Sequence, residues 1–249
     1  MATGNSNKRL GLIGKDIDYS FSRGYFAKKF QKENLQGFSY ENFDLPNAKE
    51  IPSVLQLKDL LGCNVTIPYK EAILPFLDEL SPEAQAIGAV NTVVLSPNGK
   101  KIGHNTDCYG FENALNDRLS DWPKGALILG SGGASKAIKY VLEKRNIPYL
   151  VVSRHQNHGA LTYQQVEEKH IANYPLIINC TPIGTYPNTE AAPNLPYTAL
   201  TEANFLFDLV YNPAETTFLN YGKTQGAKIA NGLKMLEYQA EKAWELWRG

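Results

Sequence analysis

The chain has 249 residues, enough to bury one large hydrophobic core or two modest ones, so we expect one or two domains. Hydrophobic residues make up 43% of it and charged residues 20%, and its 25 basic side chains balance its 25 acidic ones. A chain without net charge lacks the positive electrostatic field that attracts nucleic-acid phosphates. No apolar run approaches the length of a membrane span or the hydrophobic segment of a signal peptide. We therefore expect a small-molecule ligand, no nucleic-acid or membrane partner, and a local basic pocket for any anion.

Cysteine and histidine usage points to a reducing compartment and to no metal. Cys63, Cys108 and Cys180 are odd in number and lack paired spacing, so we expect free thiols in the cytoplasm, each acting as a small buried hydrophobe. The four histidines show no spacing typical of metal ligands, and we predict no metal site.

Short apolar runs alternate with helix-period stretches along the whole chain, which predicts an α/β fold. In the first part we predict a helix at 22–34 and strands at 9–15, 39–45, 62–68, 89–95 and 100–105, the last two pairing around the turn Pro97-Asn98-Gly99. Asp107 is well placed to cap a helix that runs to Leu119. The character of the strands changes near residues 105–107, where we place a domain break.

A second α/β run begins at Gly125. Its predicted strands, at 126–130, 149–153, 176–180 and 204–210, are almost continuously apolar, which is typical of a parallel sheet covered on both faces. Helices are expected at 132–145 and, as an amphipathic C-terminal helix, at 232–247.

A glycine-rich loop, GSGGAS at 130–135, joins the first of these strands to its helix. Gly130 permits a tight turn, and Gly132 lets the backbone approach a pyrophosphate. Gly133, Ala134 and Ser135 keep the helix start clear, so that its N–H groups face the anion. Ser131 completes the loop. This context predicts a dinucleotide-binding fingerprint, with an ordinary strand–helix turn as the alternative.

Two other nucleotide-binding motifs fit the loop poorly. A phosphate-transfer P-loop requires Gly-Lys-Ser/Thr, whereas Lys136 here follows Ser135 and precedes Ala137. A methyltransferase loop usually follows a strand that ends in an acidic residue, and this strand has none.

The end of the next strand indicates which dinucleotide binds. An NAD enzyme usually places Asp or Glu there for the ribose hydroxyls, but this strand ends Ser153-Arg154-His155, and residues 146–166 contain no acid. Arg154 is suited to stack on adenine and to pair with a 2′-phosphate, although alone it could be an ordinary surface arginine. The pattern favours NADP.

In order and spacing, a series of motifs resembles the shikimate dehydrogenase family over nearly the whole chain. The motifs are Ser20-Phe21-Ser22, NVTIPYK at 64–70, GAVNT at 88–92, GHNTD at 103–107, GSGGAS, NCTP at 179–182, DLVY at 208–211, and GLKML at 232–236 with Gln239. The resemblance implies two α/β domains with the active site in the cleft between them. Residues 1–106 plus 232–249 would form the substrate-binding catalytic domain, and residues 107–231 a Rossmann-type NADP-binding domain.

The resemblance also implies the residues of the site. Lys70 and Asp107 would be catalytic, since a lysine can protonate the carbonyl oxygen and a nearby aspartate can orient it. Substrate would be held by Ser20, Ser22, Thr66, Asn91, Tyr211 and Gln239. If Ser20 and Ser22 lie on an extended segment, their side chains face the same side. The cofactor would be held by the glycine loop, Ser153, Arg154 and His158, with Leu209, Gly232 and Met235 on the nicotinamide side.

The expected activity is reversible reduction of 3-dehydroshikimate to shikimate with NADPH, in a monomer or homodimer. A quinate or quinate/shikimate dehydrogenase is the nearest alternative, and a ligand-binding relative without turnover is a remote one. The chain departs from the family at Tyr19 and Arg23, where His and Pro are usual, and His158 stands where a stronger cation is common.

Overall fold

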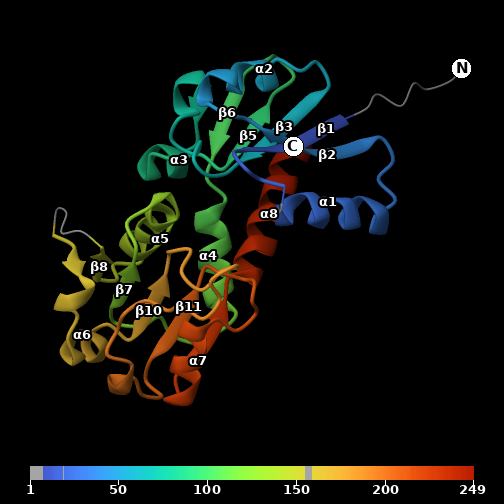
Figure 1. Ribbon diagram of the computed structural model, residues 1–249. Coiled ribbons are helices and arrows are strands. Elements are labelled where there is room, and N and C mark those ends of the chain that lie inside the picture. Colours follow the sequence, from blue (N-terminus) through green and yellow to red (C-terminus); the bar gives the residue numbers. More distant parts are fainter. Residues whose placement is uncertain (1–7, 19, 155–158) are drawn as a thin grey trace, which may run out of the picture. The chain divides into compact units, whose positions relative to one another are not determined.

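The computed structural model describes residues 8–18, 20–154 and 159–249. The chain forms two compact units (Figure 1). One unit runs up to Thr106 and includes Ala240–Gly249, and the other comprises Asp107–Gln239. Each contains a six-stranded sheet and helices, which confirms the predicted α/β class.

The sheet of the first unit has the order β2-β1-β3-β5-β6-β4. β1 pairs in parallel with both β2 and β3, whereas β5 runs antiparallel to β3 and to β6. The strands are β1 (Lys8–Gly14), β2 (Phe38–Asp44), β3 (Leu60–Val65), β4 (Glu79–Leu80), β5 (Thr92–Leu95) and β6 (Lys101–His104). The helices before residue 107 are α1 (Phe21–Lys32), α2 (Ile51–Leu55) and α3 (Pro82–Ile87), with 3-10 turns η1 (Ala48–Glu50) and η2 (Leu74–Phe76).

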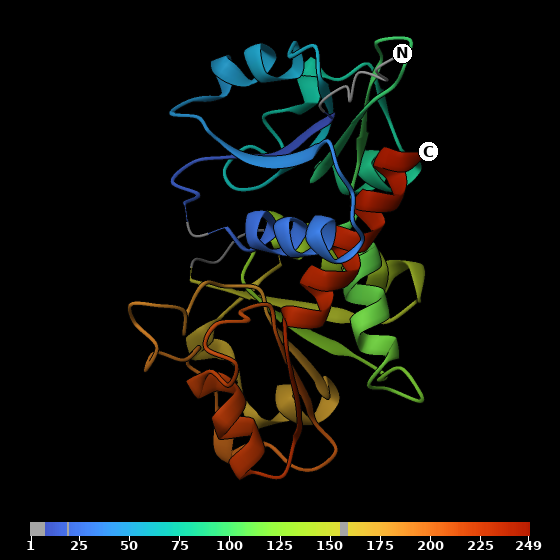
Figure 2. The ribbon, with the colours of Figure 1, turned by 90° about the vertical axis from the view of Figure 1, so that its right-hand side faces the viewer.

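Both faces of this sheet are covered, because successive strand residues point to opposite sides. Ile13 and Val65 pack on the face that carries α2 and α3. Leu10 and Leu12 pack on the other face, against aromatic residues of α1 and the last residues of the C-terminal helix α8 (Leu233–Arg248). Figures 1 and 2 show α1 beside this end of α8.

The end of α8 is tied directly to the first sheet. The Trp247 indole Nε1 donates a hydrogen bond to the Val93 carbonyl of β5 at 3.0 Å. A Cβ on Gly62 of β3 would lie 2.3 Å from that nitrogen, so a glycine is needed for the indole to approach. Trp247 also packs against Phe26 of α1, with ring centroids 5.5 Å apart.

The sheet of the second unit has the order β12-β11-β10-β7-β8-β9, and its pairings are parallel throughout. Its strands are β7 (Ala126–Leu129), β8 (Tyr149–Ser153), β9 (Leu161–Thr162), β10 (Leu176–Asn179), β11 (Phe205–Asp208) and β12 (Lys228–Asn231). Its helices are α4 (Asp107–Asn116), α5 (Gly133–Lys144), α6 (Glu168–Asn173) and α7 (Thr217–Thr224), with 3-10 turns η3 (Tyr163–Gln165) and η4 (Tyr197–Ala199) and the first residues of α8.

Helices cover both faces of the second sheet. Leu127 and Leu129 of β7 pack with residues of α6 and α7. On the opposite face, Phe207 of β11 meets Phe111 of α4 edge to face, with ring centroids 5.4 Å apart. This burial on two sides explains why the strands are continuously apolar in the sequence.

The strands and helices predicted from the sequence are present, including the β5–β6 pair, whose turn places Gly99 at φ +83°. Predicted bounds differ from the observed ones by a few residues, as at α1 and β3, and the capping role predicted for Asp107 was wrong. Asp107 is the first residue of α4 instead of the residue that caps it, and α4 ends at Asn116, before the predicted Leu119. Short elements such as α2, α3 and β9 were not predicted, because they lack enough residues to show a period. Among the described residues, no helix is both long and apolar enough to span a bilayer.

We predict that Trp247→Phe lowers the free energy of unfolding by on the order of 2 kcal/mol or more, since it removes a buried hydrogen bond and leaves a void. Trp122→Phe is the matched control. The Trp122 indole bonds to exposed Asn116 and lies over Arg145, so its loss should cost about 1 kcal/mol or less. Urea unfolding of the three proteins provides the comparison. Equal losses would show that the contact with Val93 does not hold α8 in place.

Candidate functional site

Polar residues of the first unit gather at one edge of its sheet. β1 and β3 are parallel, so their carboxyl ends meet at the same edge. Ser20 and Ser22 follow β1, whereas Thr66 and Lys70 follow β3. Asn91 joins them from the start of β5, and its carbonyl accepts a hydrogen bond from the Val65 N–H at 2.8 Å. These five predicted residues thus follow or precede strand ends that meet at one edge.

The two serines do not share an extended segment, so the condition for their side chains to face the same side is not met. Ser20 directly precedes α1, and Ser22 is the second residue of that helix. A serine is well suited to a position before a helix because its hydroxyl can satisfy a free N–H group, but Ser20 makes no such capping bond. Both side chains are half-buried.

A buried chain of hydrogen bonds holds Asn91. The Tyr40 hydroxyl donates to Asn64 Oδ1 at 2.7 Å, and Asn64 Nδ2 donates to Thr92 Oγ1 at 3.1 Å. Asn91 Nδ2 donates to Thr106 Oγ1 at 3.0 Å, while its Oδ1 accepts from the Thr106 N–H at 2.6 Å. Because both ends of the amide are bonded, the Asn91 side chain is held in one orientation.

The sequence did not reveal that Tyr40, Thr92 and Thr106 take part in this series of hydrogen bonds. Asn64 and Thr92 were visible only as parts of motifs. Their role depends on the pairing of β3 with β5, in which Asn64 lies opposite Thr92. A polar residue inside an apolar strand is the one signal that could have indicated them.

The two predicted catalytic residues lie in different units. Lys70 is half-buried in the turns after β3, where its carbonyl accepts a hydrogen bond from the Val90 N–H at 2.8 Å. Asp107 is 9% exposed and opens α4 directly after Thr106.

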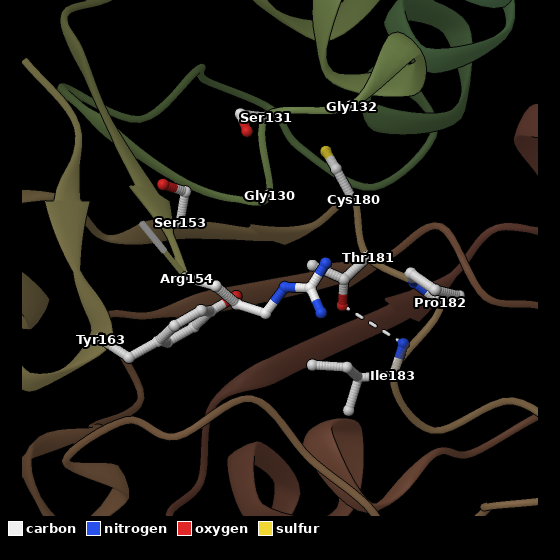
Figure 3. Close-up of a pocket in the computed structure, with 10 residues that line it drawn as sticks. All are labelled: Gly130, Ser131, Gly132, Ser153, Arg154, Tyr163, Cys180, Thr181, Pro182 and Ile183. Carbon is white, nitrogen blue, oxygen red and sulfur yellow. Dashed lines mark hydrogen bonds between the residues drawn. The ribbon is translucent and has the colours of Figure 1, made fainter. Parts of the chain in front are cut away.

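In the second unit a cavity of about 400 Å³ opens where the strand order reverses. From β7 the chain moves to β8 and β9 on one side, but β10 and β11 lie on the other. Loops that leave the carboxyl ends of β7 and β10 therefore diverge, and such a point is where open α/β sheets bind ligands. The lining residues are Gly130, Ser131, Gly132, Ser153, Arg154, Tyr163, Cys180, Thr181, Pro182 and Ile183 (Figure 3).

The glycine loop has the geometry that a dinucleotide fingerprint requires. Gly130 has φ +103°, a conformation that side chains rarely adopt, and a Cβ on it would lie 2.9 Å from Thr181. A Cβ on Gly132 or Gly133 would meet open space, so a ligand can approach this backbone. The Ser135 hydroxyl donates to the Gly132 carbonyl at 2.7 Å and is buried, which explains how serine fits at the third fingerprint position. Ala134 lies in the first turn of α5.

Ser153 and Arg154 reach the same cavity from the end of β8. Ser153 is buried, whereas Arg154 is exposed and extends its side chain into the cavity (Figure 3). None of the ten described residues that line the cavity carries a carboxylate. His158 and Tyr19 lie outside the described residues.

The expectation that all three cysteines are buried was wrong for Cys180. Cys63 and Cys108 are buried, but Cys180 is only partly buried and lines the cavity. The difference arises because Cys180 directly follows β10, at the point where the sheet ends. Burial of the sulfur raises the pKa of its thiol, so Cys180 stays protonated at neutral pH.

The remaining predicted residues follow β11 and β12, at the carboxyl edge of the second sheet. A Cβ on Gly232 would lie 2.2 Å from the Leu209 carbonyl oxygen, so these two backbones are in contact. Met235 and Gln239 are buried on α8, and Gln239 Nε2 donates to the Leu236 carbonyl at 3.0 Å. Tyr211 is half-buried, three residues beyond β11.

Comparison with known proteins matches both the sequence and the fold. Residues 12–93 match the model of the shikimate dehydrogenase substrate binding domain. A shikimate dehydrogenase (NADP(+)) of Methanococcus maripaludis is 37% identical over 98% of this chain and 93% of that protein. One of Caldanaerobacter subterraneus is 37% identical over 100% and 94%, respectively.

This chain belongs to the shikimate dehydrogenase family. Solved members of the shikimate dehydrogenase family share its architecture. The enzyme of Thermus thermophilus, in complex with NADP(H) and shikimate, has a TM-score of 0.83 and 33% identity, over 96% of this chain and 93% of that one. A quinate dehydrogenase of Corynebacterium glutamicum, in complex with NAD, has a TM-score of 0.85 but 26% identity, over 97% and 93%.

In this member of the shikimate dehydrogenase family, Asp208 ties the ends of two strands to a helix. Its carboxylate is fully buried and accepts hydrogen bonds from Asn179 Nδ2 at 2.9 Å, the Val210 N–H at 3.0 Å and Thr216 Oγ1 at 2.6 Å. Burial raises the pKa of Asp208 to about 6, and the three donors reduce that rise.

We predict that Asp208 makes the protein less stable as pH rises from about 4 to 7. Its folded pKa lies above the unfolded value of about 3.9, so the native state binds the extra proton in this interval, and the stabilisation is lost as the group ionises. The contribution is on the order of 3 kcal/mol. Asp208→Asn should therefore gain stability relative to the parent protein as pH rises. Urea unfolding at pH 4, 5.5 and 7 measures this difference, and a difference independent of pH contradicts the assignment.

Proposed function

We propose that this chain is an NADP-dependent shikimate dehydrogenase that reversibly reduces 3-dehydroshikimate to shikimate, an oxidoreductase of the shikimate pathway acting on a CH–OH group. The observation that carries the proposal is the cavity at the strand reversal, where the glycine loop and Arg154 line one space and none of the described lining residues is acidic. Family membership at 37% identity over nearly the whole chain supports the same reaction.

The described residues fit NADP. The glycine loop brings the start of α5 to the cavity, where N–H groups and the helix dipole favour a pyrophosphate. The loop residues that would contact the cofactor are Gly130, Ser131, Gly132, Gly133 and Ala134. Ser153 and Arg154 would take the ribose and its 2′-phosphate, with His158 as a further cation. The missing carboxylate matters because an acid there would repel that phosphate. Leu209, Gly232 and Met235 would contact the nicotinamide, which supplies the hydride when bound.

Residues 1–106 plus 232–249 would form the domain that binds most of the substrate, and residues 107–231 the domain that binds the cofactor. Ser20, Ser22 and Tyr211 would hold the substrate carboxylate through hydroxyl groups, which suits a chain of zero net charge. Thr66, Asn91 and Gln239 would bond to the ring hydroxyls. The fixed orientation of Asn91 supports its place in this set, since a held amide loses little entropy when substrate binds.

Lys70 and Asp107 would move the proton. During reduction the Lys70 ammonium would protonate the carbonyl oxygen as negative charge develops there, and Asp107 would orient the ammonium and the same oxygen. We further propose that the protein works in the cytoplasm, as a monomer or homodimer, where its three free thiols remain reduced.

The decisive experiment is a turnover assay that follows nicotinamide absorbance with shikimate or quinate and with NADP or NAD. We expect shikimate with NADP to be the fastest pair. Equal or faster oxidation of quinate would identify a quinate or quinate/shikimate dehydrogenase. Nucleotide binding without turnover would identify a non-catalytic relative.

We predict that Lys70→Ala lowers kcat at least about 100-fold, with a smaller change in the KM for shikimate, because it removes a positioned acid. Lys58→Ala is the matched control, since exposed Lys58 precedes β3 at the end opposite Lys70 and should leave kcat unchanged. Asp107→Asn should also slow turnover, and less than additively with Lys70→Ala, because both residues act on one oxygen. A raised KM with intact kcat would instead make Lys70 a binding residue.

A further inference from the structure

Tyr163 is part of the nucleotide cavity, although no motif in the sequence pointed to it. It directly follows the edge strand β9 and opens the 3-10 turn Tyr163–Gln165. Its ring packs against the core under the sheet, and its side chain also lines the cavity with the glycine loop and Arg154 (Figure 3). The residue is therefore anchored on one side and faces the cavity on the other.

The hydroxyl group of Tyr163 is buried without a hydrogen-bond partner among the described residues. The hydroxyl groups of buried Tyr69 and half-buried Tyr197 differ, because each has a partner. The Tyr69 hydroxyl donates to the Leu45 carbonyl at 2.6 Å, and the Tyr197 hydroxyl to the Pro193 carbonyl at 2.6 Å. Arg9 Nε and Asn42 Oδ1 also lack hydrogen-bond partners among the described residues, but neither residue lines the cavity. Since buried polar groups are almost always paired, the unpaired hydroxyl of a residue that lines the cavity is suited to take its partner from a ligand.

The position of Tyr163 relative to Arg154 indicates which part of the ligand this is. β8 and β9 are parallel, and Ser153 lies opposite Thr162, so Arg154 and Tyr163 are the first residues beyond the paired ends of these strands. The Arg154 charge acts on the phenol and lowers its pKa, but burial raises the pKa by more, so the phenol keeps its proton at neutral pH. Tyr163 is therefore a hydrogen-bond donor beside a cation, a combination suited to a phosphate oxygen.

We propose that Tyr163 and Arg154 together bind the 2′-phosphate of NADP, with the phenol O–H donating to a phosphate oxygen and the guanidinium supplying the charge. This inference rests on the proposed function. It adds a residue that determines cofactor choice, and it gives the buried hydroxyl a partner. Arg154 is exposed at a strand end, whereas the Tyr163 ring is held by the core. The tyrosine hydrogen bond would therefore fix the position of the phosphate, which the arginine charge alone would not.

The test measures binding of adenosine 2′,5′-bisphosphate and of 5′-ADP by calorimetry, which requires no turnover. Tyr163→Phe keeps the ring and removes only the hydroxyl. We expect it to weaken the bisphosphate and NADP by roughly tenfold or more, which is the range for a hydrogen bond to a charged group. Binding of 5′-ADP and NAD, and the KM for shikimate, should stay within about twofold. Arg154→Ala should show the same selectivity and serves as the reference.

Thermal unfolding without nucleotide adds a second readout. Removing an unpaired buried hydroxyl should leave the Tm of Tyr163→Phe equal to or above that of the parent protein. Tyr149→Phe is the matched control, because the Tyr149 hydroxyl on β8 bonds to Glu143, outside the cavity, and its loss should not alter nucleotide binding.

The outcomes separate the two proposals. Unchanged affinity for the bisphosphate in Tyr163→Phe overturns the inference and leaves the proposed function standing, as does equal weakening of the bisphosphate and 5′-ADP, which would place the hydroxyl at the adenine or ribose. A parent protein that binds 5′-ADP as tightly as the bisphosphate, and NAD as tightly as NADP, overturns the NADP assignment itself.

Discussion

The reversal of strand order at β7 is the constraint on which the nucleotide site depends. β8 lies on one side of β7 in the sheet, and β10 lies on the other. The loops that leave β7 and β10 therefore diverge, and a cavity remains between them. Every chemical feature assigned to that cavity is placed by a strand end. Gly130 follows β7, Arg154 follows β8, Tyr163 follows β9 and Cys180 follows β10. The apolar strands thus do more than form a core, since their common direction brings four distant segments together.

The first unit gathers its polar residues by a different arrangement. Its sheet is mixed, so the edge where β1 and β3 end is also the edge where β5 begins and β6 ends. This allows Asn91 and Thr106 to bond directly. Behind them, Tyr40, Asn64 and Thr92 extend the hydrogen bonds across three strands. A buried network of this kind is costly when any member lacks a partner, so it specifies one arrangement of the strands beneath the proposed substrate residues.

Much of the fold could be predicted from the sequence, because its signals are local. The apolar runs at β7 and β10, the helix after the glycine loop and the Pro97-Asn98-Gly99 turn each carry their pattern within a few residues. The helix predicted to begin at Ser22 is α1, which begins one residue earlier, so the two serines do not share the extended segment on which their side chains would face the same side. Tyr163 and Tyr40 could not be found in this way. Tyr163 depends on the register of an edge strand of two residues. Tyr40 bonds to Asn64, 24 residues further along the chain, because β1 brings β2 and β3 to its two sides, and neither relation is encoded nearby.

The contact between Trp247 and Val93 has a consequence for the order in which the chain can fold during synthesis. Strands of the first unit leave the ribosome first, but the face that carries Leu10 and Phe26 is closed by Ala240, Ala243, Trp244 and Trp247. That face must stay exposed while more than a hundred intervening residues, Asp107–Gln239, are being made. Those intervening residues contain the whole of the second sheet, which needs nothing made later to pair its strands. The half of the protein made first is therefore the half completed last, and the nascent chain carries an uncovered aromatic surface until residues 240–247 emerge.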